Sequence, residues 1–305
     1  MKDIVTVSTV NFSAVWGDSL ANGRRLAEYT EALARRGSDI IVFPESALTG
    51  YDVETEPQER EQLMQRRLAE TVPGPSSDRI CALARKYGVY VVFGLAERDA
   101  ADQSKVYNSA AVCQPDGRVE VYRKIHLPFS EQKWADQGEN PLTFETPWGP
   151  VGLAICYDFY CFPEILRHSR ALGARLFINC TAICTLESGG AGGYTGNVSL
   201  EYLVQANSVY VATANLFGTD RTSFFMGGSS IIGPSSRPPE AFFYAGQKFL
   251  EAGAAQGTVA TATIDLSLTG NSFLAKIWDQ EEPDWRPDLY AKWLDDLSKP
   301  RDRGR

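Results

Sequence analysis

The sequence is poor in histidine, in metal-binding cysteine patterns and in positive charge. Its 305 residues contain two histidines, His126 and His168, and no C-x-x-C pair, so a zinc site built from histidine and cysteine is not expected. Acidic residues outnumber basic ones by 38 to 30, and the net charge is −8. Nucleic acid is therefore an unexpected partner, because phosphate binding needs clustered lysine and arginine.

Long apolar runs are also missing. The chain has no stretch of about 18 apolar residues, so neither a membrane span nor a membrane partner is expected. The segment MKDIVTVSTVNF lacks a long apolar stretch and a small-residue cleavage site, which predicts no secretion signal. We therefore expect a cytoplasmic protein in which the six cysteines stay reduced.

Strand and helix patterns alternate along the chain. Apolar and β-branched runs predict strands over 4–10, 39–45, 89–95, 107–113, 118–123, 151–156, 175–179, 209–214, 227–233 and 257–264. Helical periodicity predicts helices over 18–37, 76–87, 163–172 and 198–208. Because no linker or short repeat separates these segments, the pattern indicates a single α/β domain over 1–290 with helices covering buried sheets, followed by a C-terminal tail over 291–305.

Three chemically capable side chains each follow a predicted strand, which is where catalytic groups of α/β folds gather. Glu45 lies in VFPESALTGY, Lys124 in VYRKIHLP and Cys156 in GLAICYD. Taken singly, each also fits an ordinary role, as a turn carboxylate, a solvent-facing lysine or an inert buried thiol. Taken together, they offer a base, an electrostatic partner and a nucleophile in one sheet system.

Neighbouring residues leave alternatives open. His126 is either a candidate base or a structural histidine. Cys161 is a rival nucleophile, but only Cys156 directly follows the apolar strand GLAI. The glycine-rich run over 188–197 lacks the lysine of a phosphate-binding loop, and we expect a flexible loop that borders the pocket as a lid.

The three motifs, in this order, closely resemble the signature motifs of the nitrilase (carbon–nitrogen hydrolase) superfamily. GGSSIIGP and RPDLY resemble the later motifs of the family, so the resemblance spans nearly the whole chain. It implies a four-layer αββα sandwich that pairs into a homodimer or higher homo-oligomer. By the matching motifs, Glu45 is the general base, Lys124 steadies the tetrahedral intermediate and Cys156 is the nucleophile.

The resemblance also implies further site residues. SEQKWADQG matches a stretch that supplies a second glutamate, which places Glu131 in the catalytic set and Trp134 in the aromatic position. The segment from Cys156 to Glu164 is one residue longer than the usual spacing, which leaves open whether Tyr160 or Phe162 faces substrate. The substrate-binding set expected here is Tyr51, Trp134, Tyr157, Tyr160, Phe162 and Thr181.

The dipeptide Tyr157-Asp158 after the cysteine is amidase-like, whereas nitrilases of the superfamily usually have Trp-Glu there. The resemblance therefore implies hydrolysis of a small-molecule amide through a Cys156 thioester, with release of ammonia and a carboxylic acid and without a metal or an organic cofactor. Hydrolysis of N-carbamoyl compounds or of nitriles stays open. A non-catalytic oligomeric scaffold is disfavoured, because such a protein should have lost one of the three groups.

Overall fold

The computed structural model describes residues 1–185, 192–235, 241–251, 259–270 and 284–298, with the backbone alone at 185 and 192–195. The chain divides into two compact units, 1–269 and 270–305. The predicted domain boundary at residue 290 stays a prediction. Within the described ranges, no helix has the length and apolar character that a membrane crossing requires.

The described residues of the first unit form two six-stranded sheets and a small third one. The first sheet has the order β15-β1-β2-β3-β4-β5. Its strands β1, β2 and β3 run parallel, and β4 and β5 form an antiparallel hairpin that turns through QPDG. In that order, the strands are Val259–Asp265, Ile4–Val10, Ile40–Val42, Tyr90–Arg98, Val106–Cys113 and Val119–Arg123.

The second sheet has the order β14-β13-β10-β8-β7-β6, with β10, β8 and β7 parallel. In that order, the strands are Ala241–Gly246, Ser230–Pro234, Tyr210–Asn215, Leu176–Thr181, Val151–Ile155 and Leu142–Phe144. The small sheet pairs β11 (Phe217–Thr219), β12 (Phe224–Met226) and β9 (Cys184–Thr185).

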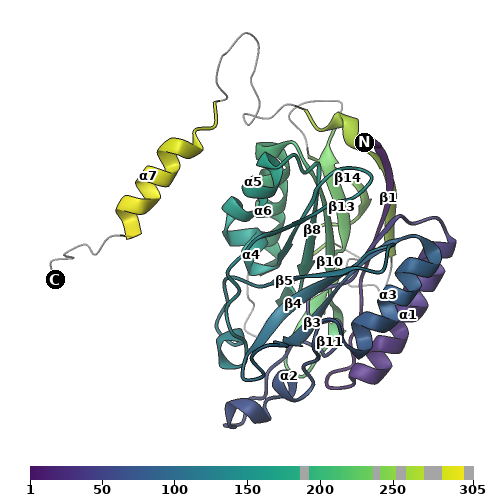
Figure 1. Cartoon of the computed structure of the whole chain (residues 1–305), viewed down its shortest axis with the longest axis vertical. Helices are drawn as coiled ribbons and strands as arrows, with labels where there is room; N and C mark the ends of the chain where they lie inside the picture. Colours follow the sequence, from purple (N-terminus) through teal and green to yellow (C-terminus); the bar gives the residue numbers. More distant parts are fainter. Residues whose placement is uncertain (186–191, 236–240, 252–258, 271–283, 299–305) are drawn as a thin grey trace. The chain divides into compact units, whose positions relative to one another are not determined.

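Helices cover the outer faces of the two sheets (Figure 1). The helices α1 (Ser19–Arg35) and α3 (Pro75–Tyr87) pack on the first sheet. The helices α4 (Tyr157–Cys161), α5 (Pro163–Ala171) and α6 (Gly192–Asn207) lie on the second. The other helices within the described ranges are α2 (Met64–Arg67), three 3₁₀ turns (Arg60–Gln62, Glu131–Lys133 and Leu266–Leu268) and, in the second unit, α7 (Pro287–Ser298).

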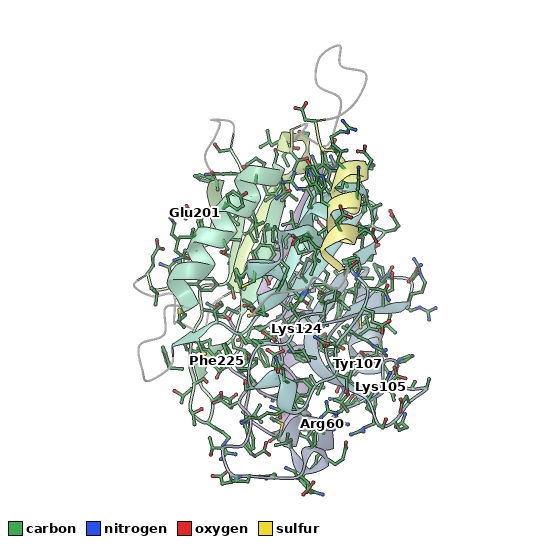
Figure 2. The ribbon with its side chains drawn as sticks, turned by 90° about the vertical axis from the view of Figure 1, so that its left-hand side faces the viewer. Arg60, Lys105, Tyr107, Lys124, Glu201 and Phe225 are labelled. Atoms are coloured by element: carbon green, nitrogen blue, oxygen red, sulfur yellow. The ribbon has the colours of Figure 1, made fainter. Side chains whose placement is uncertain are left out.

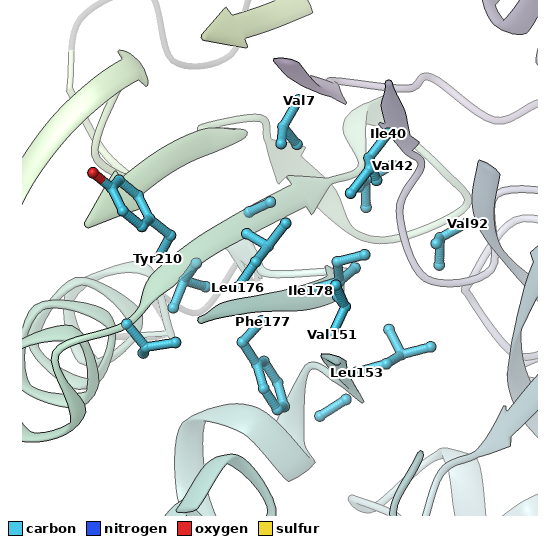
Figure 3. Close-up of a cluster of buried hydrophobic side chains, with 14 of the residues drawn as sticks. Val7, Ile40, Val42, Val92, Val151, Leu153, Leu176, Phe177, Ile178 and Tyr210 are labelled. Carbon is cyan, nitrogen blue, oxygen red and sulfur yellow. The ribbon is translucent and has the colours of Figure 1, made fainter. Parts of the chain in front are cut away.

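Burial on both faces explains why central strands such as β2 are continuous apolar runs in the sequence. Successive residues of a strand point to opposite faces. Ile40 and Val42 of β2 belong to the cluster between the sheets (Figure 3), whereas Ile41 packs toward α1 and α3 with Leu26 and Ile80. A strand covered on both faces needs apolar side chains at every position. The predicted four-layer αββα arrangement is thereby confirmed for the first unit.

Three local predictions were wrong in detail. The strand predicted over 39–45 pairs only from Ile40 to Val42, because Pro44 has no N–H to continue the ladder. No helix was predicted between the strand over 151–156 and the helix over 163–172, but the structure has the short helix α4 there. The run predicted as a loop over 188–197 is helical from Gly192, at the start of α6, and the rest of that run lies outside the described residues, so the lid stays a prediction.

Candidate active site

Glu45 lies on a turn just beyond β2, held closely against β3. The Gly94 N–H donates to the Pro44 carbonyl at 3.0 Å, and the Leu48 N–H donates to the Gly94 carbonyl at 3.1 Å. A Cβ atom on Gly94 would lie 2.6 Å from Glu45 Cα and 2.5 Å from Ser46 N. The turn that carries the predicted base therefore requires glycine at position 94.

We expect Gly94→Ala to displace this turn, lowering activity and destabilising the fold by about 1–3 kcal/mol, the usual cost of overpacking. Gly23→Ala in α1 is the matched control, because its added Cβ would find its nearest neighbour, Leu48 Cδ1, at 3.6 Å. In a helix interior, alanine is favoured over glycine by roughly 0.5–1 kcal/mol. Urea unfolding measures both variants, and equal stabilities would contradict the close-approach argument.

Lys124 follows β5 and is fully buried (Figure 2). Its backbone N–H donates to the Asn108 carbonyl, and its carbonyl accepts from the Gly138 N–H, both at 2.8 Å. Its Nζ donates to Glu45 Oε1 and to Glu131 Oε1, each at 2.7 Å. One ammonium thus joins two buried carboxylates that lie far apart in the sequence.

Two further side chains complete this buried cluster. Asn108 Nδ2 donates to Glu45 Oε1 at 2.8 Å and to Glu131 Oε2 at 2.9 Å. The Tyr51 hydroxyl donates to Glu131 Oε1 at 2.9 Å. Asn108 was not predicted from the sequence, where its only signal is a polar residue inside the buried strand β4. The other oxygen of Glu45, Oε2, is buried and has no hydrogen-bond partner among the described residues, so it is free to accept a proton.

Cys156 occupies a strained turn between β7 and α4. Its φ of 46° and ψ of −99° are unusual for a residue with a Cβ atom and cost about 1–3 kcal/mol. Its N–H donates to the Cys180 carbonyl at 2.9 Å and approaches Asn179 Oδ1 at 3.2 Å. Strain of this kind is common at functional sites, where the surrounding hydrogen bonds hold it.

The charges of the cluster act on one another and on the thiol. Burial raises the pKa of Glu45 to about 7, with Lys124 opposing the shift and Glu131 adding to it. Burial alone would lower the pKa of Lys124, but the charges of Glu131 and Glu45 outweigh it and raise that pKa. Burial and the Glu45 carboxylate raise the pKa of the Cys156 thiol, while Lys124 opposes them. These interactions place the thiol within electrostatic reach of both partners.

The aromatic residues after Cys156 take different positions. The Tyr160 hydroxyl accepts from Asn179 Nδ2 at 3.0 Å, and burial together with the Cys156 charge raises the pKa of Tyr160. Phe162 instead stacks on the His126 ring, with centroids 3.5 Å apart, and meets Tyr157 edge-on. The sequence left open whether Tyr160 or Phe162 faces substrate. In the structure, Tyr160 is the residue that lies near the Cys156 thiol.

The remaining predicted binding residues are distributed around the cluster. The Tyr51 ring meets Phe225 edge-on, with centroids 5.8 Å apart. Thr181 is buried at the end of β8, where hydrogen bonding by its hydroxyl opposes the rise in the pKa of Cys156 and of Tyr160. Trp134 is 1% exposed and packs in a cluster with Leu63 and Val106. The role of Trp134 in substrate binding stays a prediction.

A surface cavity of about 730 Å³ lies elsewhere, and its walls include Tyr107, Arg123 and Asp136. None of Glu45, Lys124 and Cys156 lines it. Arg123 is already paired with Glu97 and Asp99. In the part of the chain that the structure describes, no group of three or more His, Cys, Asp and Glu side chains could hold a metal ion. The buried cluster, rather than this cavity, is the candidate active site.

Known proteins resemble this chain in sequence. Residues 6–271 match the family model for carbon-nitrogen hydrolase. Omega-amidase NIT2 of Xenopus tropicalis is 30% identical over 274 residues, covering 85% of this chain and 86% of that protein. A nitrilase of Pyrococcus abyssi is 31% identical over 212 residues, covering 67% of this chain and 71% of that protein.

Solved structures share the fold. An amidase from Nesterenkonia sp. superposes with a TM-score of 0.75 at 19% identity, covering 96% of this chain and 98% of the amidase. A cysteine-to-alanine mutant of the amidase from Nesterenkonia sp. AN1 was solved in complex with butyramide. The chain belongs to the carbon–nitrogen hydrolase family, on the amidase-like branch of the nitrilase superfamily, and is an amidase-type enzyme that hydrolyses C–N bonds.

Proposed function

We propose that this enzyme hydrolyses a small amide through a thioester on Cys156, with Glu45 as general base and Lys124 as electrostatic partner. The observation that carries the proposal is the buried cluster, in which Lys124 Nζ lies 2.7 Å from both Glu45 and Glu131. A fully buried ammonium with two carboxylates is costly to maintain for stability alone. Such clusters of perturbed groups are typical of catalytic sites.

In the first half of the reaction, Glu45 removes the thiol proton as Cys156 Sγ attacks the amide carbonyl carbon. Lys124 and the Tyr157 N–H stabilise the negative oxygen that forms, since the first N–H groups of a helix have no acceptor within that helix. The C–N bond then breaks as Glu45 donates its proton to the amide nitrogen, which leaves as ammonia. The acyl group remains on Cys156 as a thioester.

In the second half, Glu45 removes a proton from water, and the resulting hydroxide attacks the thioester carbonyl. The C–S bond breaks, the carboxylic acid leaves, and the proton held by Glu45 returns to the Cys156 sulfur. Glu131, Asn108 and Tyr51 hold Lys124 and Glu45 in place through both halves. The raised pKa of the thiol explains why the nucleophile needs a base at all.

The pH dependence of kcat/KM follows from the raised pKa of Glu45. The base acts only when deprotonated, and burial raises its pKa to about 7. We therefore expect kcat/KM to fall about tenfold per pH unit below pH 7 and to level off above it. Initial rates between pH 5 and pH 8 would show this limb, with circular dichroism at each pH to exclude unfolding. Undiminished activity at pH 5 in the folded protein would argue against Glu45 as base.

The substrate class is tested by an ammonia-release screen. Similarity to an omega-amidase and to an amidase solved with butyramide favours primary amides and ω-amides of oxo acids. Similarity to a nitrilase makes nitriles the second candidate substrate class. N-carbamoyl compounds are the fourth class in the screen. Release from amides that stops in Cys156→Ala supports the proposal. Release from nitriles alone, or from none of the four classes, contradicts it.

Assembly and location stay predictions. A homodimer or higher homo-oligomer is proposed from the resemblance described above, and a cytoplasmic location from the sequence. Sedimentation velocity of the purified chain tests the first, since a monomer at micromolar concentration would contradict it.

A further inference from the structure

Asp158 connects the two motifs that carry Lys124 and Cys156. It lies two residues after Cys156, in α4, and is fully buried. Its Oδ2 accepts from the Tyr122 hydroxyl at 2.5 Å and from the Ile125 N–H at 2.9 Å. Its Oδ1 accepts from the His126 N–H at 2.9 Å and lies 2.7 Å from His126 Nδ1. All these contacts are with residues that flank Lys124.

The position of this carboxylate matters because the two motifs belong to different sheets. Lys124 follows β5 at the edge of the first sheet, whereas Cys156 follows β7 in the second. A rigid set of hydrogen bonds between them fixes the distance from the ammonium to the thiol. Catalysis depends on such placement, since small errors in the position of a reacting group are costly.

The same network reaches the aromatic residues after the nucleophile. The His126 ring, held by Asp158, stacks on Phe162 with an interplanar angle of 8°. Phe162 in turn meets Tyr157 edge-on, with centroids 5.3 Å apart. Burial and the Asp158 charge also raise the pKa of Tyr122, so its hydroxyl stays a donor. His126 is therefore a structural partner of Asp158 in this arrangement.

We propose that Asp158 is a positioning residue, which through Tyr122, Ile125 and His126 sets Lys124 against Cys156 for attack on the substrate. Its effect on turnover rests on the proposed function, but its effect on the thiol does not. A purely structural carboxylate would change stability and leave the chemistry of each folded molecule unchanged.

The mildest test removes a single hydroxyl. Tyr122→Phe deletes one hydrogen bond to Asp158 and keeps the ring. We expect kcat to fall about tenfold with KM within about twofold, a size consistent with losing a hydrogen bond to a charged group. Iodoacetamide labelling of Cys156, referred to the exposed Cys161 in the same sample, should slow by a similar factor, because the thiolate is less well stabilised.

The matched control is Tyr87→Phe. The Tyr87 hydroxyl, in α3, donates to Glu31 Oε1 of α1 at 2.5 Å, the same length as the bond from Tyr122 to Asp158. This variant loses a bond of the same length, though a less buried one, on the helices of the first sheet, so kcat and the labelling rate should stay at wild-type values. Asp158→Asn should lower kcat further, by about a hundredfold, since it disturbs several donors at once.

The results for these variants distinguish a positioning role of Asp158 from a purely structural one. Wild-type kcat and labelling rate in Tyr122→Phe would overturn the proposal, even if that variant melts at a lower temperature. If Asp158→Asn does not fold, the two tyrosine variants decide the question alone. If the wild-type enzyme releases no ammonia from any amide, the proposed function fails, whereas the labelling rates still test whether Asp158 positions the thiol.

Discussion

Cys156→Ala is expected to abolish turnover, lowering kcat by about 10⁴-fold or more, the usual scale for loss of a covalent nucleophile. The half-buried thiol is small, so we expect the free energy of unfolding to change by less than about 2 kcal/mol. The loss would therefore be one of chemistry rather than of folding. Ammonia release at saturating substrate measures the first quantity, and urea unfolding measures the second.

Cys161→Ala is the control for this experiment. Cys161 lies in the same short helix, is exposed, and was the rival nucleophile in the sequence analysis. It should keep kcat within about twofold, as surface substitutions usually do. The opposite pattern, an active Cys156→Ala and an inactive Cys161→Ala, would exchange the assigned roles of the two cysteines.

Lys124→Met is expected to abolish turnover and to destabilise the fold at the same time. Methionine replaces the buried stem of the lysine but removes the charge that joins Glu45 and Glu131. Breaking a buried ion pair from one side costs about 3–5 kcal/mol, because the partner charges stay uncompensated. The oxyanion would also lose its electrostatic partner, which removes a further two or three orders of magnitude from kcat.

The loss of stability in Lys124→Met should become smaller as the pH falls. Without the ammonium, the pKa of Glu45 loses the opposing effect of Lys124 and rises further, and protonation then removes the charge of this carboxyl. Stability relative to wild type should therefore recover as the pH falls from 8 to 5. Lys133→Met, at an exposed position, is the control and should stay within about 0.5 kcal/mol of wild type. A full loss of stability that is independent of pH would contradict the charge argument.

Much of this site could be predicted because its parts are local motifs at strand ends. Glu45, Lys124 and Cys156 each follow an apolar run, and the sheets bring the ends of those runs together. Glu131 followed from a motif of fixed spacing, and the structure places it 2.7 Å from Lys124 Nζ. In each case, the sequence signal lies within about ten residues of the side chain.

Asn108 and Asp158 could not be found in this way. Asn108 bonds a glutamate 63 positions before it, and Asp158 accepts from a tyrosine 36 positions before it. Such partners are defined only once the chain has folded, so no local pattern identifies them. For Trp134, the sequence alone does not separate the two possible roles, since an aromatic side chain suits a pocket wall and a core equally well.

The most direct test is to locate the covalent intermediate. The enzyme is mixed with a primary amide that it turns over, quenched in acid and digested with trypsin. Cys156 and Cys161 share one tryptic peptide, because no lysine or arginine lies between Lys133 and Arg167, so fragmentation must assign the modified sulfur. We predict an acyl group, the mass of the amide less ammonia, on Cys156. Steady turnover with the acyl group on another residue would contradict the account.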